Sequence, residues 1–473
     1  MLNRALTLLK PAPVAARIRD QAEINARYRY WRFRILYSSL IGYALFYFVR
    51  KNLSLAMPVM EQDLGISKAD LGIFLTLHGI CYGVSKFANG FLGDRTNPRY
   101  FMALGLILSA LMNVCFGLSS AVTALGIFWL LNGWFQGMGF PPCARSLTQW
   151  FDAQERGTRF AIWNTSHSIG AAAALLVCSR LVFLDWRLCF LVPALLATLG
   201  AVFLIERMRD TPESLGLPSI EEYRGEAEAS EVNAASPGAP GDSLETGQGE
   251  ALPPEGEFRQ FVIQQVLLNP MIWVISVANF FVYTVRAAIL DWGPTFLTET
   301  KHVELHHAGW IVAGYEVAGV FGMLVSGWMT DKLFRGRGGR ACFFYMLLCA
   351  ACIYLFWRLP GQSVFVNTAL LCAIGFFIYG PQCLVGVIAA NLATKRAAAT
   401  AIGVTGLFGY LSGILSGWGL GRIVQSGGWD PGLGTILASA GVATVLFALS
   451  WNASHPTLRQ PRAFPVLELE AKQ

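Results

Sequence analysis

Residues 90–99 read GFLGDRTNPR, and residues 327–335 read GWMTDKLFR. Each stretch follows an apolar run and places a glycine four residues before an aspartate that a basic residue follows. Each also stands at the same distance behind an arginine: 44 residues separate Arg50 from the first aspartate, and 45 separate Arg286 from the second. The same pattern in both halves of the chain indicates an internal repeat.

Apolar segments long enough to cross a bilayer recur on both sides of these signatures. Of the 473 residues, 54% are hydrophobic and only 14% are charged, whereas a soluble domain is about 25% charged. A helix needs roughly 20 apolar residues to span a bilayer. The pattern predicts twelve spans, at 35–58, 68–92, 100–118, 121–143, 158–180, 187–206, 270–298, 307–329, 341–358, 363–391, 397–421 and 432–452. The expected fold is an all-α membrane protein with two six-helix halves.

The halves, at 35–206 and 266–452, are separated and flanked by polar segments. These are a basic head (1–34), an acidic linker (207–265) whose composition predicts disorder, and a tail (453–473). The head, the tail and the loops after even-numbered spans hold 26 of the 36 Lys and Arg, so the positive-inside rule places both termini in the cytoplasm. The start of the head also fits an organellar targeting peptide, but the head runs into the first span without a break.

Two arginines fall inside apolar spans, where a charge costs roughly 2.5–3.5 kcal/mol. Arg50 lies within the first span, and Arg286 lies near the middle of the seventh. Few carboxylates can meet them: Asp291 is about 140° around the helix from Arg286, and Glu316 is the main remaining acid. We expect the arginines to bind an anionic ligand, because a guanidinium binds phosphate or carboxylate with two hydrogen bonds. The alternative is that each arginine pairs with a buried carboxylate.

Other polar side chains inside the spans are candidates for the same site. Lys86 is a third cation, unless it extends to the membrane interface. Lys51 faces either the site or an interface, and His167 is either a hydrogen-bonded core residue or a ligand of the anion. The tyrosines inside spans 1, 7 and 10 are Tyr43, Tyr47, Tyr283 and Tyr379. The first two lie on the same helical face as Arg50 and can donate hydrogen bonds to an oxyanion.

The repeated signature predicts a conformational latch as well. Its charged residues are Asp94, Arg95, Arg99, Asp331 and Lys332. Acids and bases at these helix ends can pair across the halves when the cytoplasmic side is shut, although charges that only set the topology would give the same pattern. The sequence has no GxxxxGK[ST], HExxH, GxSxG or paired CxxC motif, so we expect no enzyme, cofactor or metal site.

Several strings resemble those of the organophosphate:phosphate antiporters, a branch of the major facilitator superfamily. They include GYALFYFVRKNLSLAMP, GVSKFANGFLGDRTNPRYF, GWFQGMGFPPCAR, WNTSHSIG and VYTVRAAILDWGPTFL, and the resemblance covers residues 24–450. It implies that the arginines of spans 1 and 7 bind the substrate phosphate. The matching positions are Arg50, Arg286, Lys86, His167, Asn164, Tyr283 and Tyr379.

The resemblance also implies a function. It predicts a bacterial inner-membrane carrier that exchanges a hexose 6-phosphate or glycerol 3-phosphate for inorganic phosphate, with the bilayer but no nucleic acid as a partner. The head and the string around Arg286 most resemble the hexose-phosphate sensor of the same branch. The alternative is therefore a receptor that signals to a membrane histidine kinase. A carboxylate or sugar symporter is a third interpretation, which the scarcity of buried acids disfavours.

Overall fold

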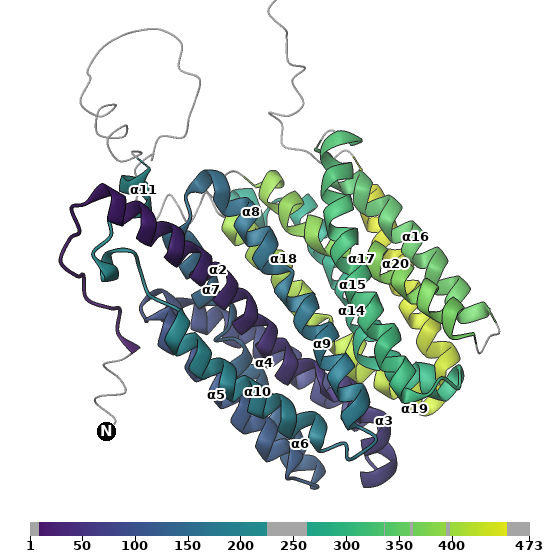
Figure 1. The fold of residues 1–473 in the computed structure, drawn as a ribbon. Coiled ribbons are helices and arrows are strands. Elements are labelled where there is room, and N and C mark those ends of the chain that lie inside the picture. The colour runs from purple at the N-terminus through teal and green to yellow at the C-terminus, as the bar shows by residue number, and fades with distance from the viewer. Residues whose placement is uncertain (1–8, 225–262, 335, 360–362, 394–397, 452–473) are drawn as a thin grey trace, which may run out of the picture.

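The computed structural model describes residues 9–224, 263–334, 336–359, 363–393 and 398–451. Within these residues the chain is helical, and nine helices are long and apolar enough to cross a membrane: Lys68–Gly90, Pro98–Gly117, Leu188–Arg207, Pro270–Thr300, Leu305–Thr330, Gly338–Arg358, Val364–Leu392, Thr400–Gly427 and Trp429–Leu449. They correspond to nine of the twelve predicted spans. The helices of the first half, purple to teal, lie beside those of the second half, green to yellow (Figure 1).

The first half holds the three predicted spans that are missing from this set. Its helices are α2 (Gln21–Lys51), α3 (Leu53–Leu64), α4 (Lys68–Asp94), α5 (Pro98–Gly117), α6 (Val122–Gln136), α7 (Phe140–Trp150), α8 (Ala153–Asn164), α9 (Ser166–Leu181) and α10 (Leu188–Arg207). The first, fourth and fifth spans are each divided into two helices, α2–α3, α6–α7 and α8–α9. None of these pieces alone meets the length and hydropathy that a span requires.

The first of these breaks is held by buried asparagines. Val49 leaves helical geometry (φ −92°, ψ 18°), and its carbonyl accepts hydrogen bonds from Asn113 Nδ2 at 3.0 Å and Asn132 Nδ2 at 2.9 Å. Asn52 Nδ2 donates to Asn113 Oδ1 and to the carbonyl of Cys189, both at 2.8 Å. A backbone carbonyl that lacks its helical hydrogen bond at membrane depth must be hydrogen-bonded by another group of the protein, and here the asparagine amides do so. Arg50 lies directly beside this break.

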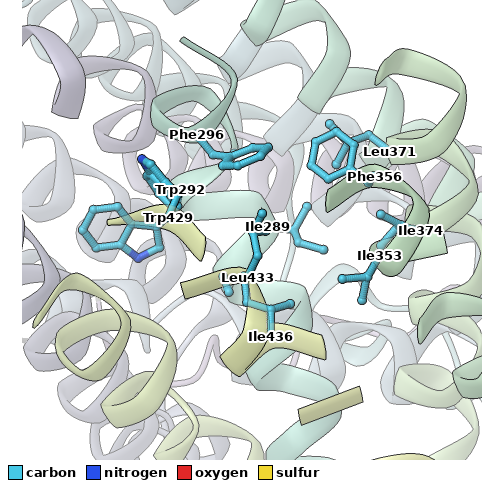
Figure 2. Close-up of a pocket in the computed structure, with 12 residues that line it drawn as sticks. Ile289, Trp292, Phe296, Ile353, Phe356, Leu371, Ile374, Trp429, Leu433 and Ile436 are labelled. Carbon is cyan, nitrogen blue, oxygen red and sulfur yellow. The ribbon is translucent and has the colours of Figure 1, made fainter. Parts of the chain in front are cut away.

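The second half combines long helices with shorter ones. They are α14 (Pro270–Thr300), α15 (Leu305–Lys332), α16 (Gly338–Arg358), α17 (Val364–Leu392), α18 (Ala398–Leu411), the π-helix η3 (Ile414–Gly419), α19 (Leu420–Gly427) and α20 (Trp429–Leu449). Figure 2 shows the apolar core of this half, where Ile289, Phe356 and Leu433 approach from three helices. The space left there is about 20 Å³, so this core holds at most about one water molecule.

The two halves touch where α4 begins. The start of α4 packs on η3 so closely that a Cβ atom on Gly72 would lie 2.5 Å from the carbonyl oxygen of Gly417. Thr76 Oγ1 donates to the carbonyl of Gly413 at 2.7 Å, and the backbone N–H of Lys68 donates to Gln425 Oε1 at 2.9 Å. Small residues permit this approach, and the contact closes the molecule at that end.

Toward the opposite end of α4, which we call the open end, the first half carries a cleft of about 580 Å³ between the end of α4 and helix α7. Lys86 and Gly90 line one wall of this cleft, and Phe140 and Arg145 line the other. The halves are thus in direct contact at one end of α4, and the first half carries a cleft toward the other end.

The predicted disordered linker is folded in its first part. Residues 209–224 contain η1 (Glu213–Leu215) and α11 (Ile220–Tyr223), which pack against the head. The hydroxyl of Tyr28 donates to the carbonyl of Pro218 at 2.6 Å, and its ring stacks on Tyr223 at 4.0 Å. The prediction of disorder from residue 207 is therefore wrong for this stretch. Residues 225–262, the first eight residues and the segment 452–473 lie outside the described residues.

The head itself extends the first helix. α2 begins at Gln21, where the Asp20 carboxylate accepts a hydrogen bond from the N–H of Ala22 at 3.1 Å, and it continues into the first span without interruption. Burial raises the pKa of the Asp210 carboxyl, which accepts from the N–H of Ala12 at 2.8 Å and lies 3.0 Å from Arg145. These contacts fix the head and the start of the linker on the first half.

Candidate functional site

Arg50 lies at the end of α2, where the helix breaks. Its guanidinium carbon is 4.1 Å from the ring centroid of Tyr82 and 5.3 Å from that of Tyr47. These distances permit cation–π attraction. Among the described residues no carboxylate forms an ion pair with Arg50, and its guanidinium lies against these two tyrosine side chains.

Arg286 lies in the middle of α14 and has a different environment. Its Nη2 donates to the hydroxyl of Tyr379 at 2.8 Å and lies 3.7 Å from Glu316 Oε1. Glu316 is fully buried on α15, and neither of its oxygens accepts a hydrogen bond from the described residues. For Arg286 the alternative that the arginine pairs with a buried carboxylate therefore holds, and the acid is Glu316. The partner comes from a neighbouring helix, and single-helix geometry does not reveal such contacts.

An ion pair formed by Lys51 joins the two halves directly. Lys51 Nζ lies 2.6 Å from Asp291 Oδ1, and the side chains are only 11% and 14% exposed. Asp291 thus pairs with Lys51 of the first half and not with Arg286. This agrees with the positions of Asp291 and Arg286 on different faces of α14. The ion pair ties the break in the first span to the seventh.

Aromatic side chains connect the two arginines. The Tyr47 ring, which lies beneath Arg50, is 5.7 Å from the imidazole of His167. That imidazole stacks on Tyr379 at 6.1 Å, and Tyr379 in turn contacts Arg286. His167 Nδ1 donates to the backbone carbonyl of Asn164, whereas Nε2 is buried without a hydrogen-bond partner among the described residues. Five of the predicted site residues thus form one continuous cluster that spans both halves.

Lys86 belongs to a second branch of this cluster. Its ammonium lies 3.8 Å from the ring centroid of Phe140 and donates to the hydroxyl of Tyr410 at 3.1 Å. The Tyr410 ring is 5.3 Å from that of Tyr82, which lies under Arg50. Lys86 therefore faces the open cleft and the other half, not the membrane interface. Lys86 is one of the residues that line this cleft.

The remaining predicted residues lie around this cluster. The hydroxyl of Tyr43 is 3.4 Å from that of Tyr82, and its ring lies 4.8 Å from Trp163. Tyr283 packs closely on Gly409. A Cβ atom added to this glycine would lie 3.3 Å from the Tyr283 ring. The described contact of Asn164 is made by its carbonyl, not by its amide.

Two residues of the cluster escaped the sequence interpretation. Tyr82 contacts Arg50, Tyr410 contacts Lys86, and the two rings lie against each other between the cations. Tyr82 stands four residues before Lys86 on the same helix, so the spacing places both on one face. Tyr410 follows a glycine-rich string, and no spacing in the sequence connects it to the first half.

The predicted latch is not closed by the described side chains. Arg95 and Lys332 are exposed, and Arg99 Nε donates to the backbone carbonyl of Ile205 within its own half. The side chains of Asp94 and Asp331 lie outside the described ones. A latch across the halves stays a prediction for the state in which the open end closes.

Comparison with known proteins agrees with this architecture. Residues 39–417 match the model of the Major Facilitator Superfamily. A bacterial homologue of the human lysosomal transporter Spinster, solved in an inward-facing and unoccupied conformation, superposes with a TM-score of 0.70 at 16% identity, over 90% of this chain and 98% of the other. This likeness concerns the fold.

Relatives of higher identity extend over the whole chain. A probable hexose phosphate transport protein of Chlamydia pneumoniae is 41% identical over 97% of this chain and 99% of its own length. The glycerol-3-phosphate transporter of Bacillus subtilis is 38% identical, with 94% and 98% covered. The membrane sensor protein UhpC of Escherichia coli is also 38% identical, with 95% and 99% covered. The chain is a multi-pass membrane protein that belongs to the Major Facilitator Superfamily.

Proposed function

We propose that this protein is a secondary transporter of the bacterial inner membrane that exchanges an organophosphate for inorganic phosphate. The observation that carries the proposal is the cluster in which Arg50 of the first half and Arg286 of the second are joined through three aromatic rings. Relatives whose names include hexose phosphate and glycerol-3-phosphate transport support the same substrate class.

The charges of the cluster favour a dianion. Arg50, Lys51, Lys86 and Arg286 supply four positive charges, and Asp291 and Glu316 supply two negative ones, so two positive charges remain. A phosphoryl group bound between the arginines balances them and accepts bidentate hydrogen bonds from each fork. The hydroxyls of Tyr47, Tyr283 and Tyr379 can donate further bonds, and so can the unpartnered Nε2 of His167 when the imidazole is protonated, with Tyr43 and Asn164 supporting them.

This charge balance explains why transport is an exchange. Without a ligand, closing the open end would bury the excess positive charge, which is costly at low dielectric. With phosphate or an organophosphate bound, the charge is neutralised and the halves can rock around the site. The latch residues Asp94, Arg95, Arg99, Asp331 and Lys332 would then pair as that end shuts. Such a cycle needs no cofactor, and it makes and breaks no covalent bond, so the protein does not act as an enzyme.

The proposed orientation places the open end in the cytoplasm. Both termini and residue 230 are then cytoplasmic, and residue 303 is periplasmic. Fusions of alkaline phosphatase and green fluorescent protein at 230 and 303 test the assignment. Fluorescence at 230 and phosphatase activity at 303 are expected, whereas phosphatase activity at 230 would contradict the span count.

A sensor of hexose phosphates is the second candidate, because the relative named as a membrane sensor matches nearly the whole chain. A sensor needs the same phosphoryl site, but it signals to a partner such as a histidine kinase instead of cycling. The folded head and linker, held together by Tyr28 and Tyr223, offer a fixed surface at the end where a kinase would dock.

Reconstituted vesicles separate the two candidates. Vesicles loaded with inorganic phosphate should take up labelled glucose 6-phosphate or glycerol 3-phosphate, and empty vesicles should take up little. Equal uptake by loaded and empty vesicles would contradict exchange. Binding of glucose 6-phosphate without measurable uptake would favour the sensor.

A further inference from the structure

A second cationic cleft lies at the start of α2, away from the central cluster. Its volume is about 510 Å³. Arg29 and Arg32 of α2 and Arg159 of α8 line its polar side. Phe33 and Leu36 line its apolar side, which faces the surface of the molecule. The cleft is therefore amphipathic as well as basic.

The described residues that line this cleft include three arginines and no carboxylate. Arg32 and Arg159 stack on the ring of Phe151 at 4.8 and 5.6 Å, and both pair with Glu155. Arg224 also pairs with Glu155, at 3.1 Å, and with Asp152, at 2.7 Å. These carboxylates lie behind the lining, as do Glu213 and Glu221, which act on Tyr28, so the cationic groups face the cleft itself.

The arginines also retain donors that the described residues do not use. The Nε atoms of Arg32 and Arg159 are buried without a hydrogen-bond partner there, and Arg29 is exposed without an ion pair. Burial lowers the pKa of Arg32, and the nearby charges of Arg224 and Arg159 lower it further. The cleft therefore has unused donors and an excess of positive charge, which together favour an anion.

The cleft lies where α2 enters the apolar part of the molecule. The Phe33 side chain is 69% exposed and that of Tyr30 is 53% exposed, three residues apart on the same helix. Aromatic residues at the end of a membrane span lie at the level of the lipid headgroups. The ring of Tyr223 closes the other side of the cleft, and its stacking on Tyr28 holds it there.

We propose that this cleft binds the headgroup phosphate of an anionic phospholipid, with the acyl chains along Phe33 and Leu36. Basic pockets on the cytoplasmic side of membrane proteins bind such headgroups. Free phosphate shares the chemistry of the headgroup, but it makes no use of an exposed apolar wall beside the arginines. The site is separate from the central cluster, so the proposal does not depend on which solute is transported.

Native mass spectrometry of the full chain in detergent, titrated with phosphatidylglycerol or phosphatidylcholine, tests the proposal. The wild type should bind one phosphatidylglycerol more tightly than phosphatidylcholine. Arg29→Gln should weaken phosphatidylglycerol binding about fivefold, the effect of one basic side chain at an anionic headgroup. Arg29 is exposed, so this variant should keep the wild-type melting temperature. Arg19→Gln removes the same charge from the exposed head outside the cleft and should bind like the wild type.

Two further arms identify the source of the phosphate. Phe33→Ser should weaken binding of phosphatidylglycerol, and millimolar inorganic phosphate should not displace the lipid. Equal affinities in Arg29→Gln and Arg19→Gln would overturn the proposal. Displacement by inorganic phosphate, together with unchanged binding in Phe33→Ser, would overturn it in favour of a site for soluble anions.

Discussion

The arginines of the two halves occupy equivalent places in the repeat, but their surroundings differ. Arg50 lies against the rings of Tyr82 and Tyr47 and has no carboxylate partner among the described residues. Arg286 lies 3.7 Å from the buried Glu316 and donates to Tyr379. The first half thus presents an uncompensated charge, and the second presents one that is already partly neutralised.

This difference suggests an order of events. An incoming phosphoryl group gains most from Arg50, because there it replaces no other anion. At Arg286 the group must share the guanidinium with Glu316, so binding there costs part of an existing ion pair. The asymmetry would keep the bound phosphate exchangeable, because the second half supplies an anion of its own when the substrate leaves.

The largest effect is expected from replacing either arginine by lysine. Arg50→Lys and Arg286→Lys keep the charge but lose the fork, so two charge-assisted hydrogen bonds of about 1.5 kcal/mol each are lost. Phosphate exchange in proteoliposomes should fall about 100-fold. Arg27→Lys, on the exposed part of α2, is the control and should exchange normally. Exchange near the control rate in either site variant would refute the two-arginine site.

A smaller effect is expected at the ion pair between the halves. Lys51→Ala or Asp291→Ala leaves a mostly buried charge unpaired, and exchange should fall about tenfold, or about 1.4 kcal/mol. The double variant Lys51→Asp, Asp291→Lys restores an ion pair with opposite polarity and should recover most of the rate. A double variant no better than the single ones would show that these charges act separately.

Removing the carboxylate beside Arg286 should act in the opposite direction. Glu316→Gln abolishes the competing anion with little change in volume, so inorganic phosphate should bind about fivefold more tightly. Exchange should slow, because release becomes harder. Isothermal titration and the vesicle assay measure the two quantities. Weaker phosphate binding in this variant would mean that Glu316 supports the bound anion instead of competing with it.

The smallest effect is expected at the break beside Arg50. Asn132→Ala removes one of the two donors to the carbonyl of Val49 and should lower the stability by about 1 kcal/mol. The melting temperature should fall by a few degrees, while Asn25→Ala on the exposed head should leave it unchanged. Retention of the wild-type melting temperature in Asn132→Ala would show that Asn113 alone holds the break.

The sequence predicted the helical architecture, because span length and the repeated signature depend on local composition. It also placed Arg50, Arg286 and His167 at membrane depth, where a polar group must be offset by a partner or a ligand. It named Glu316 as the main acid available to the arginines, but it could not assign this acid to Arg286, because that pairing depends on how two helices cross. For the same reason the asparagines that hold the break at Val49 were not recognised as a set.

The folded start of the linker was missed for a related reason. Its composition resembles that of disordered segments, but Asp210 is held by Arg145 and by the backbone of the head. Such contacts join positions that are far apart in the chain. Composition alone does not contain them.

Equilibrium binding of labelled inorganic phosphate to the purified wild-type protein tests the central claim most directly. The account predicts one phosphate per chain, competition by glucose 6-phosphate and glycerol 3-phosphate, and no competition by glucose or glycerol, because the arginines recognise only the phosphoryl group. Competition by free glucose at the concentrations at which glucose 6-phosphate competes, or the absence of phosphate binding, would contradict a phosphoryl site between Arg50 and Arg286.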